Sequence, residues 1–392
     1  MSELSKFLNK NMEDINKILS IDVGNISKMF GVDLQTSESN RTLWTWGFNC
    51  DGQLGLGDTT DRSSPVQVGS DMNWESAFGA RHTVSIKSDG TIWVCGNNDY
   101  GQLGLGDTTD ISSPIQVGSD TNWESVATGK SDTGYYTMAI KSDGTLWAWG
   151  RNTNGQLGLG DTDNRSSPVQ VGSDTNWESI EGGYHHTMAI KSNGTLWAWG
   201  DNDYGQLGLG DTTDVSSPVQ VGSDTNWESA TTGAWHTMAI RSNGTLWAWG
   251  RHDYGRLGLG NTTDRSSPVQ VGSDTNWESV GAGVLHTMAI KSNGTLWAWG
   301  YNDYGQLGLG DTDNRSSPVQ VGSDTNWESA TTGVYHTIAI KSDGSLWAWG
   351  YNNQGQLGLG DTTNRSSPVQ VGSDTNWYYS ACGGYHTITL RS

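Results

Sequence analysis

The chain contains seven near-copies of one unit, and this repetition limits its possible folds more than any other feature. Each copy has a Trp-Gly junction, which is Cys-Gly in the second copy. The steps between the junction glycines are 49 and 54 residues and then 50 each time; these glycines are Gly47, Gly96, Gly150, Gly200, Gly250, Gly300 and Gly350. Units this alike share one architecture, so the sequence predicts a solenoid, a propeller or a linear array rather than unrelated domains.

One complete copy, residues 274–323, has the pattern of four short β-strands separated by Gly-rich or polar stretches. Asn293-Gly294 is a strong hairpin signal, for which we expect positive φ at both turn positions. The expected strands are residues 277–280, 286–291, 296–299 and 318–321. Proline begins the fourth strand of every copy, where an edge strand loses no ladder hydrogen bond. The prolines are Pro65, Pro114, Pro168, Pro218, Pro268, Pro318 and Pro368.

The two ends of the chain hold complementary parts of one unit. The last copy stops after a second strand at residues 386–390, and the missing third strand is present at residues 43–47. We therefore predict an all-β fold, a seven-bladed β-propeller of four-stranded blades over residues 39–392, in which these two segments pair antiparallel and close the ring. Bulky Trp297 and Trp299 alternate with smaller residues along the third strand, so the bulky side of each blade would fill the small side of the next.

The repeat resembles that of the regulator of chromosome condensation family. The run Gly-x-x-His-Thr-Met-Ala-Ile-Lys-Ser-x-Gly-Thr-Leu-Trp-Ala-Trp-Gly-x-Asn-x-x-Gly-Gln-Leu-Gly carries this resemblance over residues 39–392. The copy at residues 233–258 departs from it at His252 and Arg256, which replace Asn and Gln. The resemblance implies a seven-bladed propeller and no single activity, because members serve as exchange factors, inhibitors and scaffolds.

Residues 1–38 differ from the rest of the chain and predict a short helical docking extension. Its apolar residues fall largely at helical spacing: Leu4, Phe7, Leu8, Met12, Ile15, Ile18, Leu19, Ile26, Met29 and Phe30. We expect them to anchor the protein on another structural subunit; a helix packed on the propeller or free in solution is the alternative. The pattern around Asn25–Val32 also resembles the N-termini of phage virion proteins.

Charge and cysteine content exclude several classes of partner. The formal net charge is −20, so we expect no binding to nucleic acid or to an anionic membrane surface. No run is apolar enough to insert in a membrane, and charged residues interrupt any signal-peptide core near the N-terminus. Cys50, Cys95 and Cys382 have no metal-site or disulfide spacing, and we expect three free thiols. The compartment stays open.

No catalytic or metal site is expected, and no cofactor. One histidine per copy occupies an equivalent position, with Tyr136 in its place in the second copy; these are His82, His186, His236, His286, His336 and His386. A ring of this kind indicates a structural role near the start of a strand. Asp201–Gly205 and Gly310–Asp313 have only a faint similarity to calcium loops, and turn-forming Asp and Asn explain them better.

The copies differ most at two sets of loop positions, one just before the ring histidine and one just after the Trp-Gly junction. Both sets flank the same strand ends, so we expect them on one face, rich in the Tyr, Trp and Arg that dominate binding hot spots. The candidate partner-binding residues are Phe48, Arg81, Tyr135, Arg151, His185, Asp201, Trp235, Arg251, Leu285, Tyr301, Tyr335, Tyr351 and Tyr385. Drift at tolerant loop positions is the alternative. The β-lactamase-inhibitor proteins of this family resemble the chain in having an aromatic-rich propeller face.

These observations predict a non-catalytic binding and structural propeller, which recognises a protein or glycan through the aromatic face. The resemblance of the N-terminal segment favours a phage virion appendage or fibre, on the virion surface or extracellular. Guanine-nucleotide exchange on a small GTPase is one alternative, with a cytoplasmic location, although the only insertion, residues 130–134, is short for a wedge. Inhibition of an enzyme is the other.

Overall fold

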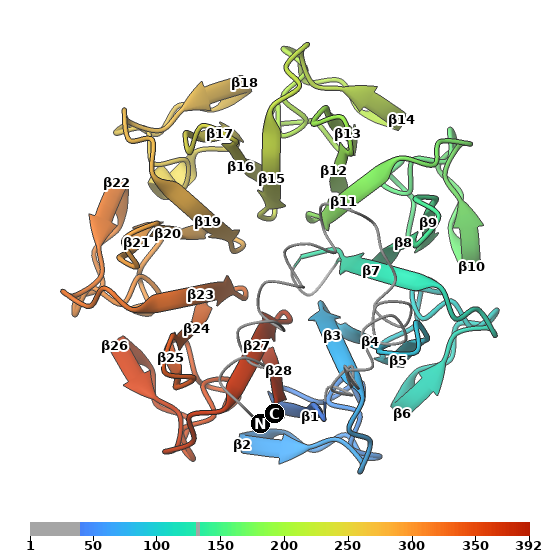
Figure 1. The fold of residues 1–392 in the computed structure, drawn as a ribbon, viewed down its shortest axis with the longest axis horizontal. Coiled ribbons are helices and arrows are strands. Elements are labelled where there is room, and N and C mark those ends of the chain that lie inside the picture. Colours follow the sequence, from blue (N-terminus) through green and yellow to red (C-terminus); the bar gives the residue numbers. More distant parts are fainter. Residues whose placement is uncertain (1–39, 131–133) are drawn as a thin grey trace, which may run out of the picture. The chain divides into compact units, whose positions relative to one another are not determined.

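The computed structural model of the protein describes residues 40–130 and 134–392. Its strands form seven antiparallel four-stranded sheets arranged as blades around a central axis (Figure 1). Blade 1 has β3 (Trp74–Gly79), β4 (His82–Lys87), β5 (Ile92–Gly96) and β6 (Ile111–Gln116). Blade 2 has β7 (Trp123–Thr128), β8 (Tyr136–Lys141), β9 (Leu146–Gly150) and β10 (Arg165–Gln170). Blade 3 has β11 (Trp177–Gly182), β12 (His186–Lys191), β13 (Leu196–Gly200) and β14 (Val215–Gln220).

The remaining blades repeat this plan. Blade 4 has β15 (Trp227–Thr232), β16 (His236–Arg241), β17 (Leu246–Gly250) and β18 (Arg265–Gln270), with the one-turn 3₁₀ helix η1 (Asp253–Gly255) before β18. Blade 5 has β19 (Trp277–Ala282), β20 (His286–Lys291), β21 (Leu296–Gly300) and β22 (Arg315–Gln320). Blade 6 has β23 (Trp327–Thr332), β24 (His336–Lys341), β25 (Leu346–Gly350) and β26 (Arg365–Gln370). Blade 7 joins β27 (Trp377–Cys382) and β28 (His386–Arg391) to β1 (Thr42–Gly47) and β2 (Arg62–Gln67).

The predicted closure of the ring is confirmed. Strand β1 pairs antiparallel with β28, and Trp44 lies opposite Thr389, Trp46 opposite Thr387 and Gly47 opposite His386. The first strand of each blade runs toward the centre, and the fourth lies at the periphery (Figure 1). Because the first and last strands share blade 7, the propeller has no free blade at either end of the repeat.

The hairpin between the second and third strands differs in one detail from the prediction. Positive φ occurs only at Gly294, with φ 73°, and not at Asn293, so the expectation for both turn positions was wrong. The loop is wider than a two-residue turn, because the Gly294 N–H donates to Lys291 O at 2.8 Å and the Lys291 N–H to Thr295 O at 3.1 Å. The Asn293 side chain instead accepts the Thr295 hydroxyl at 2.7 Å, which explains why Asn and Asp recur there.

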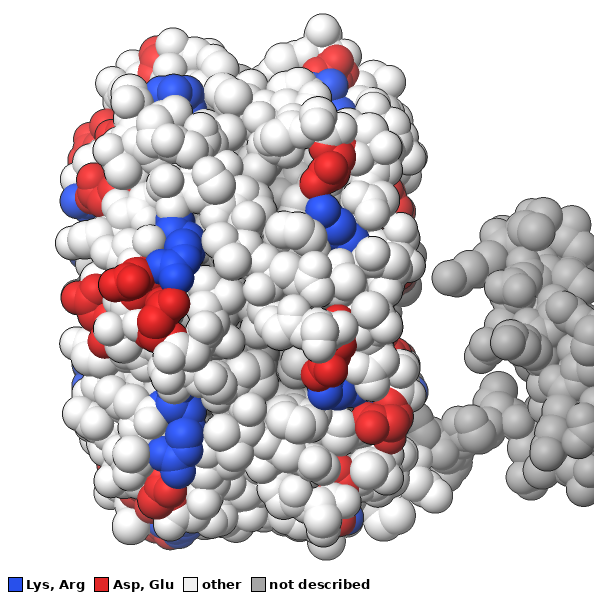
Figure 2. Space-filling view, turned by 90° about the vertical axis from the view of Figure 1, so that its left-hand side faces the viewer, with Lys and Arg blue, Asp and Glu red and all other residues white. Residues whose placement is uncertain are grey.

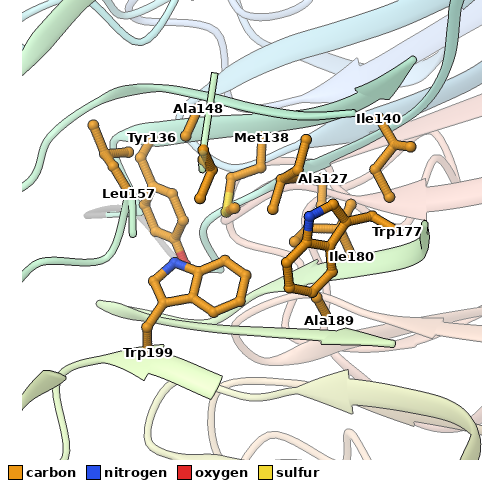
Figure 3. Close-up of a cluster of buried hydrophobic side chains, with 12 residues drawn as sticks. Ala127, Tyr136, Met138, Ile140, Ala148, Leu157, Trp177, Ile180, Ala189 and Trp199 are labelled. Atoms are coloured by element: carbon orange, nitrogen blue, oxygen red, sulfur yellow. The ribbon is translucent and has the colours of Figure 1, made fainter. Parts of the chain in front are cut away.

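The hydrophobic core lies between blades, as the alternation of large and small residues predicts. Tyr136, Met138 and Leu157 of blade 2 face Trp177 and Trp199 of blade 3 (Figure 3). The same combination of aliphatic residues on one blade and tryptophans on the next recurs around the ring. Each blade therefore packs against both of its neighbours.

A basic side chain covers a tryptophan pair at one end of each blade. In blade 5, Lys291 Nζ lies 4.7 Å from the Trp277 ring centroid and 3.9 Å from that of Trp297. It also pairs with Asp274 at 2.7 Å. Along the rim, Figure 2 shows adjacent basic and acidic side chains in two columns, with largely uncharged surface between them.

The predicted helical extension and all ten of its anchor residues lie outside the described residues, so that part of the fold stays a prediction. In the described part of the chain, no helix has the length and hydrophobicity that a membrane crossing requires.

Candidate protein-binding face

The two variable sets of loop residues lie on one face of the propeller, which we call the variable face. The residue after each junction glycine donates its backbone N–H to the residue before the ring histidine or, in blade 2, before Tyr136. Examples are Phe48 N–H to Tyr385 O at 3.0 Å and Tyr351 N–H to Tyr335 O at 2.8 Å. The same bond joins Arg151 to Tyr135, Asp201 to His185, Arg251 to Trp235 and Tyr301 to Leu285. The expected juxtaposition of the two sets is thus confirmed.

One half of the variable face is a continuous group of aromatic rings, which we call the tyrosine cluster. It consists of Tyr254, Tyr301, Tyr304, Tyr335, Tyr351 and Tyr385, with Phe48 at its end. Tyr304 lies centrally, with ring centroids 5.1 Å from Tyr335 and 4.9 Å from Tyr351. Tyr385 extends the contacts to Phe48 at 6.5 Å. Because each ring is held by its neighbours, little side-chain entropy remains to be lost when a partner binds.

The other half combines aromatic rings with arginines. Arg251 Cζ lies 4.6 Å from the Tyr204 ring centroid and 5.1 Å from that of Trp235. Its Nε donates to Asp253 at 2.5 Å. Two further arginines each repeat one part of this arrangement: Arg151 lies over Tyr100, and Arg81 Nε donates to Asp51 at 2.5 Å. These cations are held in place, which suits recognition of carboxylate or backbone carbonyl groups.

Not every candidate residue is accessible. His185 and Asp201 are 7% and 5% exposed, and Tyr135 is 9% exposed and stacks on Tyr100. Leu285 packs on an apolar cluster, together with Tyr184, Trp235, Tyr335 and Tyr385; the buried members of that cluster are Ala234, Val284 and Val334. Tyr135, His185, Asp201 and Leu285 therefore support the face. Its surface is made mainly by the arginines, by Trp235 and by the tyrosine cluster, whose rings are mostly half-buried.

Four further tyrosines belong to the face and were not predicted from the sequence: Tyr100, Tyr204, Tyr254 and Tyr304. Each lies four residues after the junction glycine, and because the tyrosine repeats in four copies, differences between copies did not reveal it. Their closeness to the variable residues in sequence was the available signal. In the structure all four contact candidate residues through aromatic rings.

The ring histidines link successive blades. His286 Nε2 lies 3.1 Å from the Thr337 hydroxyl of blade 6, and His386 Nε2 lies 3.1 Å from the Thr83 hydroxyl of blade 1. Burial lowers the pKa of His286 and His386 to about 3, so both are neutral at pH 7. In blade 2, the Tyr136 hydroxyl instead donates to His186 O at 2.6 Å. The geometry supports the structural interpretation of this ring.

One group of carboxylates, Asp201, Asp203 and Asp214, brings ligand-type oxygens within 4.8 Å of one another. Loop structure accounts for two of them: Asp214 accepts the Asn202 N–H at 2.8 Å, and Asp201 accepts the Asp203 N–H at 3.1 Å. Burial raises the pKa of Asp201 to about 6. In blade 5 the residue equivalent to Asp214 is Asn314, which accepts the same backbone bond, so the interaction needs no charge.

The three cysteines are free thiols, as expected. Cys50 is exposed on the variable face, where its Sγ lies 3.5 Å from an Arg81 guanidinium nitrogen. Cys95 is buried in place of the junction tryptophan, and Cys382 is partly buried near the central axis. Burial raises the pKa of Cys50, so the structure provides no activated nucleophile here.

The fold is a seven-bladed propeller built from one repeated unit. The regulator of chromosome condensation (RCC1) repeat matches the chain seven times, at residues 42–86, 89–138, 143–190, 193–240, 243–290, 293–340 and 343–390. A second description of the same repeat matches residues 177–206, 228–256, 277–306 and 329–356. The chain therefore belongs to the RCC1 repeat family.

Known proteins resemble the chain either in sequence or in fold. The ultraviolet-B receptor UVR8 of Arabidopsis thaliana is 35% identical over 132 residues, which cover 33% of this chain and 30% of UVR8. Prp20p from Saccharomyces cerevisiae superimposes with a TM-score of 0.79 at 19% identity, covering 95% of each chain. Human WBSCR16 also gives 0.79, at 21% identity, covering 90% of this chain and 99% of its own. At these identities the two structures show a shared fold.

Proposed function

We propose that this chain is a non-catalytic protein-binding propeller that grips a partner through the variable face. The observation that carries the proposal is the tyrosine cluster, whose rings come from loops of blades 4 to 7 and contact one another without a break. Tyrosine is enriched at the centres of protein interfaces, because a ring supplies apolar area and the hydroxyl supplies a hydrogen bond. The arginine-bearing half gives the same face its polar contacts.

The family supports a binding role without naming the partner. The structure of Prp20p was described together with its binding properties toward Gsp1p and histones. Another structure holds yeast RCC1 (Prp20) bound to Kap60, at a TM-score of 0.79 and 19% identity, covering 90% of this chain and 89% of that one. Protein partners are thus the precedent on this fold, and a glycan is the alternative outcome of the test.

The test compares two aromatic sites in the full chain, one of half-buried tyrosines on the variable face and one of an exposed tyrosine elsewhere. A double variant, Tyr335→Ala with Tyr351→Ala, removes the middle of the tyrosine cluster. Tyr378→Ala is the matched control, because Tyr378 is 59% exposed and lies at the opposite end of the strands. A partner recovered with the wild-type chain should bind the double variant at least about tenfold more weakly and the control unchanged. Equal binding by all three proteins would refute the assignment of the face.

Guanine-nucleotide exchange on a small GTPase is the second candidate. The specific reason is the likeness to Prp20p over 95% of both chains, together with the exchange activity that the family resemblance implies. Release of a fluorescent guanine nucleotide from a small GTPase would accelerate with the wild-type chain and slow with the double variant. No acceleration with any GTPase that binds the chain would leave a scaffold or inhibitor role.

The predicted setting in a phage virion draws no support from these comparisons. It depends on residues 1–38, which lie outside the described residues, and none of the proteins named above is described as a virion component. We therefore favour the cytoplasmic alternative. Deleting residues 1–38 should leave a folded propeller, because the ring closes through residues 41–392 alone.

A further inference from the structure

The loop between the third and fourth strands contains a tight turn that six blades hold together in the same way. In blade 5, the Gly305 N–H donates to Asn302 O at 2.8 Å, with Asp303 and Tyr304 at the centre of the turn. The Tyr304 N–H donates to the side-chain oxygen of Gln306 at 3.0 Å. Five other copies repeat this bond: Asp51 to Gln53, Tyr100 to Gln102, Asn154 to Gln156, Tyr204 to Gln206 and Gln354 to Gln356.

Blade 4 lacks this bond because Arg256 replaces the glutamine. A guanidinium group has only donors, so it cannot accept the Tyr254 N–H. The Arg256 Nε instead donates to the carbonyl oxygen of Asp253 at 3.1 Å. The peptide between Asp253 and Tyr254 is therefore turned over relative to the other copies, and its oxygen rather than its N–H is directed toward the side chain of residue 256.

The backbone of Tyr254 records this reversal. Its φ of 61° and ψ of 7° match the third residue of a type II turn, where glycine is favoured. Among the described residues, Tyr254 is the one non-glycine residue with a positive φ, and the equivalent Tyr100, Tyr204 and Tyr304 do not have it. Because this strained conformation occurs in the blade that lacks the glutamine, we attribute it to Arg256.

The Tyr254 side chain is also the most accessible ring of the variable face. It is 46% exposed, whereas the other aromatic side chains described on this face are half-buried or buried. Its ring centroid lies 4.9 Å from that of Tyr301, and its loop also contains Arg251, so it stands where the tyrosine cluster meets the arginine-bearing half. A ring that is exposed before binding has the largest apolar area to bury against a partner.

We propose that Arg256 is a positioning residue of the variable face: its bond to Asp253 O turns the peptide over and presents the Tyr254 ring to the partner. This inference rests on the proposed protein-binding function. Arg256 is fully buried, so it acts through Tyr254 and does not itself touch the partner. The positive φ and the buried charge are both unfavourable for stability, and local rules are typically broken in this way at functional positions.

The crystal structure of the full chain with Arg256→Gln tests the first step, and it needs no partner. The glutamine oxygen should accept the Tyr254 N–H as in the other six copies, and the φ of Tyr254 should become negative, about −90°. The reverse variant, Gln306→Arg, should give Tyr304 a positive φ. A positive φ at Tyr254 in Arg256→Gln, or a negative φ at Tyr304 in Gln306→Arg, would overturn the proposal.

Binding of the partner recovered with the wild-type chain tests the second step. Tyr254→Ala and Arg256→Gln should each weaken binding at least about fivefold. The two changes together should weaken it no more than either alone, because they remove the same contact. Arg256→Lys has donors only, like arginine, and should bind like wild type. Wild-type binding by Arg256→Gln, or losses that add in the combined variant, would overturn the positioning role.

These outcomes are distinct from failure of the proposed function. Equal binding by the Tyr335 and Tyr351 double variant would refute the face as the binding site, and the turn geometry would still test Arg256. A loss in that double variant with none in Arg256→Gln would keep the face and overturn only this inference. Because Arg256→Gln should raise stability, unfolding would not explain a loss of binding in that variant.

Discussion

The indole N–H of Trp46 donates a hydrogen bond to the carbonyl oxygen of Gln356, 2.9 Å away and 310 residues along the chain. Trp46 belongs to blade 7, and Gln356 lies in the loop between the third and fourth strands of blade 6. The same bond at the same length joins Trp249 to Gln206 between blades 4 and 3. The junction that closes the ring is therefore built like a junction within the continuous repeat.

Trp46→Ala should lower the free energy of unfolding by about 3–5 kcal/mol, because it removes a fully buried indole and leaves a cavity. Urea denaturation measures this value. Trp249→Ala is the matched control, since its environment is the same within a continuous part of the chain, and it should lose a similar amount. A much smaller loss for Trp46→Ala would show that the shared blade is loosely closed.

Lys291→Met should lose about 1–2 kcal/mol of stability. Methionine keeps the apolar stem against Trp277 and Trp297 but removes the cation–π contact and the pairing with Asp274. Lys291→Arg should change stability little, because Arg241 has the equivalent place over two tryptophans in blade 4. Thermal unfolding measures the stability of both variants. An equal loss of stability in Lys291→Met and Lys291→Arg would contradict this account.

Arg256→Gln should stabilise the protein by about 1–3 kcal/mol. Arg256 is fully buried, and its Nη1 and Nη2 have no hydrogen-bond partner among the described residues, although Nη2 lies 3.7 Å from an Asp253 oxygen. Burial lowers its pKa to about 10, which reflects the cost of the charge. The other six copies all carry glutamine there, so the uncharged side chain fits the site.

The reverse change, Gln306→Arg, is the control for that prediction and should destabilise by a similar amount. Gln306 is also fully buried at the equivalent position of blade 5. Chemical denaturation measures the free energy of unfolding of both variants, and the two changes relative to wild type should have opposite signs. A loss of stability in Arg256→Gln would mean that the guanidinium makes a favourable contact.

Acid should destabilise the propeller through the ring histidines. The pKa of His286 is about 3 in the folded protein and about 6.5 when unfolded, so the unfolded state binds more protons between these pH values. The contribution of the neutral His286 to the free energy of unfolding is complete above pH 6.5 and falls as the pH decreases toward 3. Each such histidine contributes a slope of about 1.4 kcal/mol per pH unit below about pH 5.5.

His286→Gln tests this prediction by the slope of stability against pH rather than by stability itself. Between pH 5.5 and 4, the slope of the free energy of unfolding against pH should be smaller in the variant by about 1.4 kcal/mol per pH unit, which is the contribution of one proton. Urea denaturation at each pH measures this slope. An unchanged slope would show that His286 is protonated in the folded state. Carboxylates with lowered pKa, such as Asp161 and Asp361, add their own acid dependence and are the same in both proteins.

Local pattern was sufficient for most of the fold, because every copy contains the signals for its own strands. The glycine of the hairpin acts within a few residues of itself. The expectation that proline opens the fourth strand was wrong, because β22 begins at Arg315 and Pro318 lies inside it, where the pairing with β21 shifts register. The prediction of positive φ at Asn293 was wrong. The Asn293 side chain accepts a hydrogen bond from the Thr295 hydroxyl, and this bond, rather than the backbone φ, explains why asparagine or aspartate stands there. The sequence predicted that the two variable sets of loop residues lie together. It did not predict that the repeated tyrosines, such as Tyr304, lie among them.

The sequence by itself determined the repeat, the strands, the number of blades and the splitting of one blade between the termini, since each follows from residues close together in the chain or from their count. Only the tertiary structure decided which side chains meet. Tyr254 contacts Tyr301, and the Tyr379 hydroxyl donates to the Ala77 carbonyl oxygen, because the ring brings loops and strands of different copies together. Contacts between copies depend on the curvature and closure of the whole ring, which no single copy encodes.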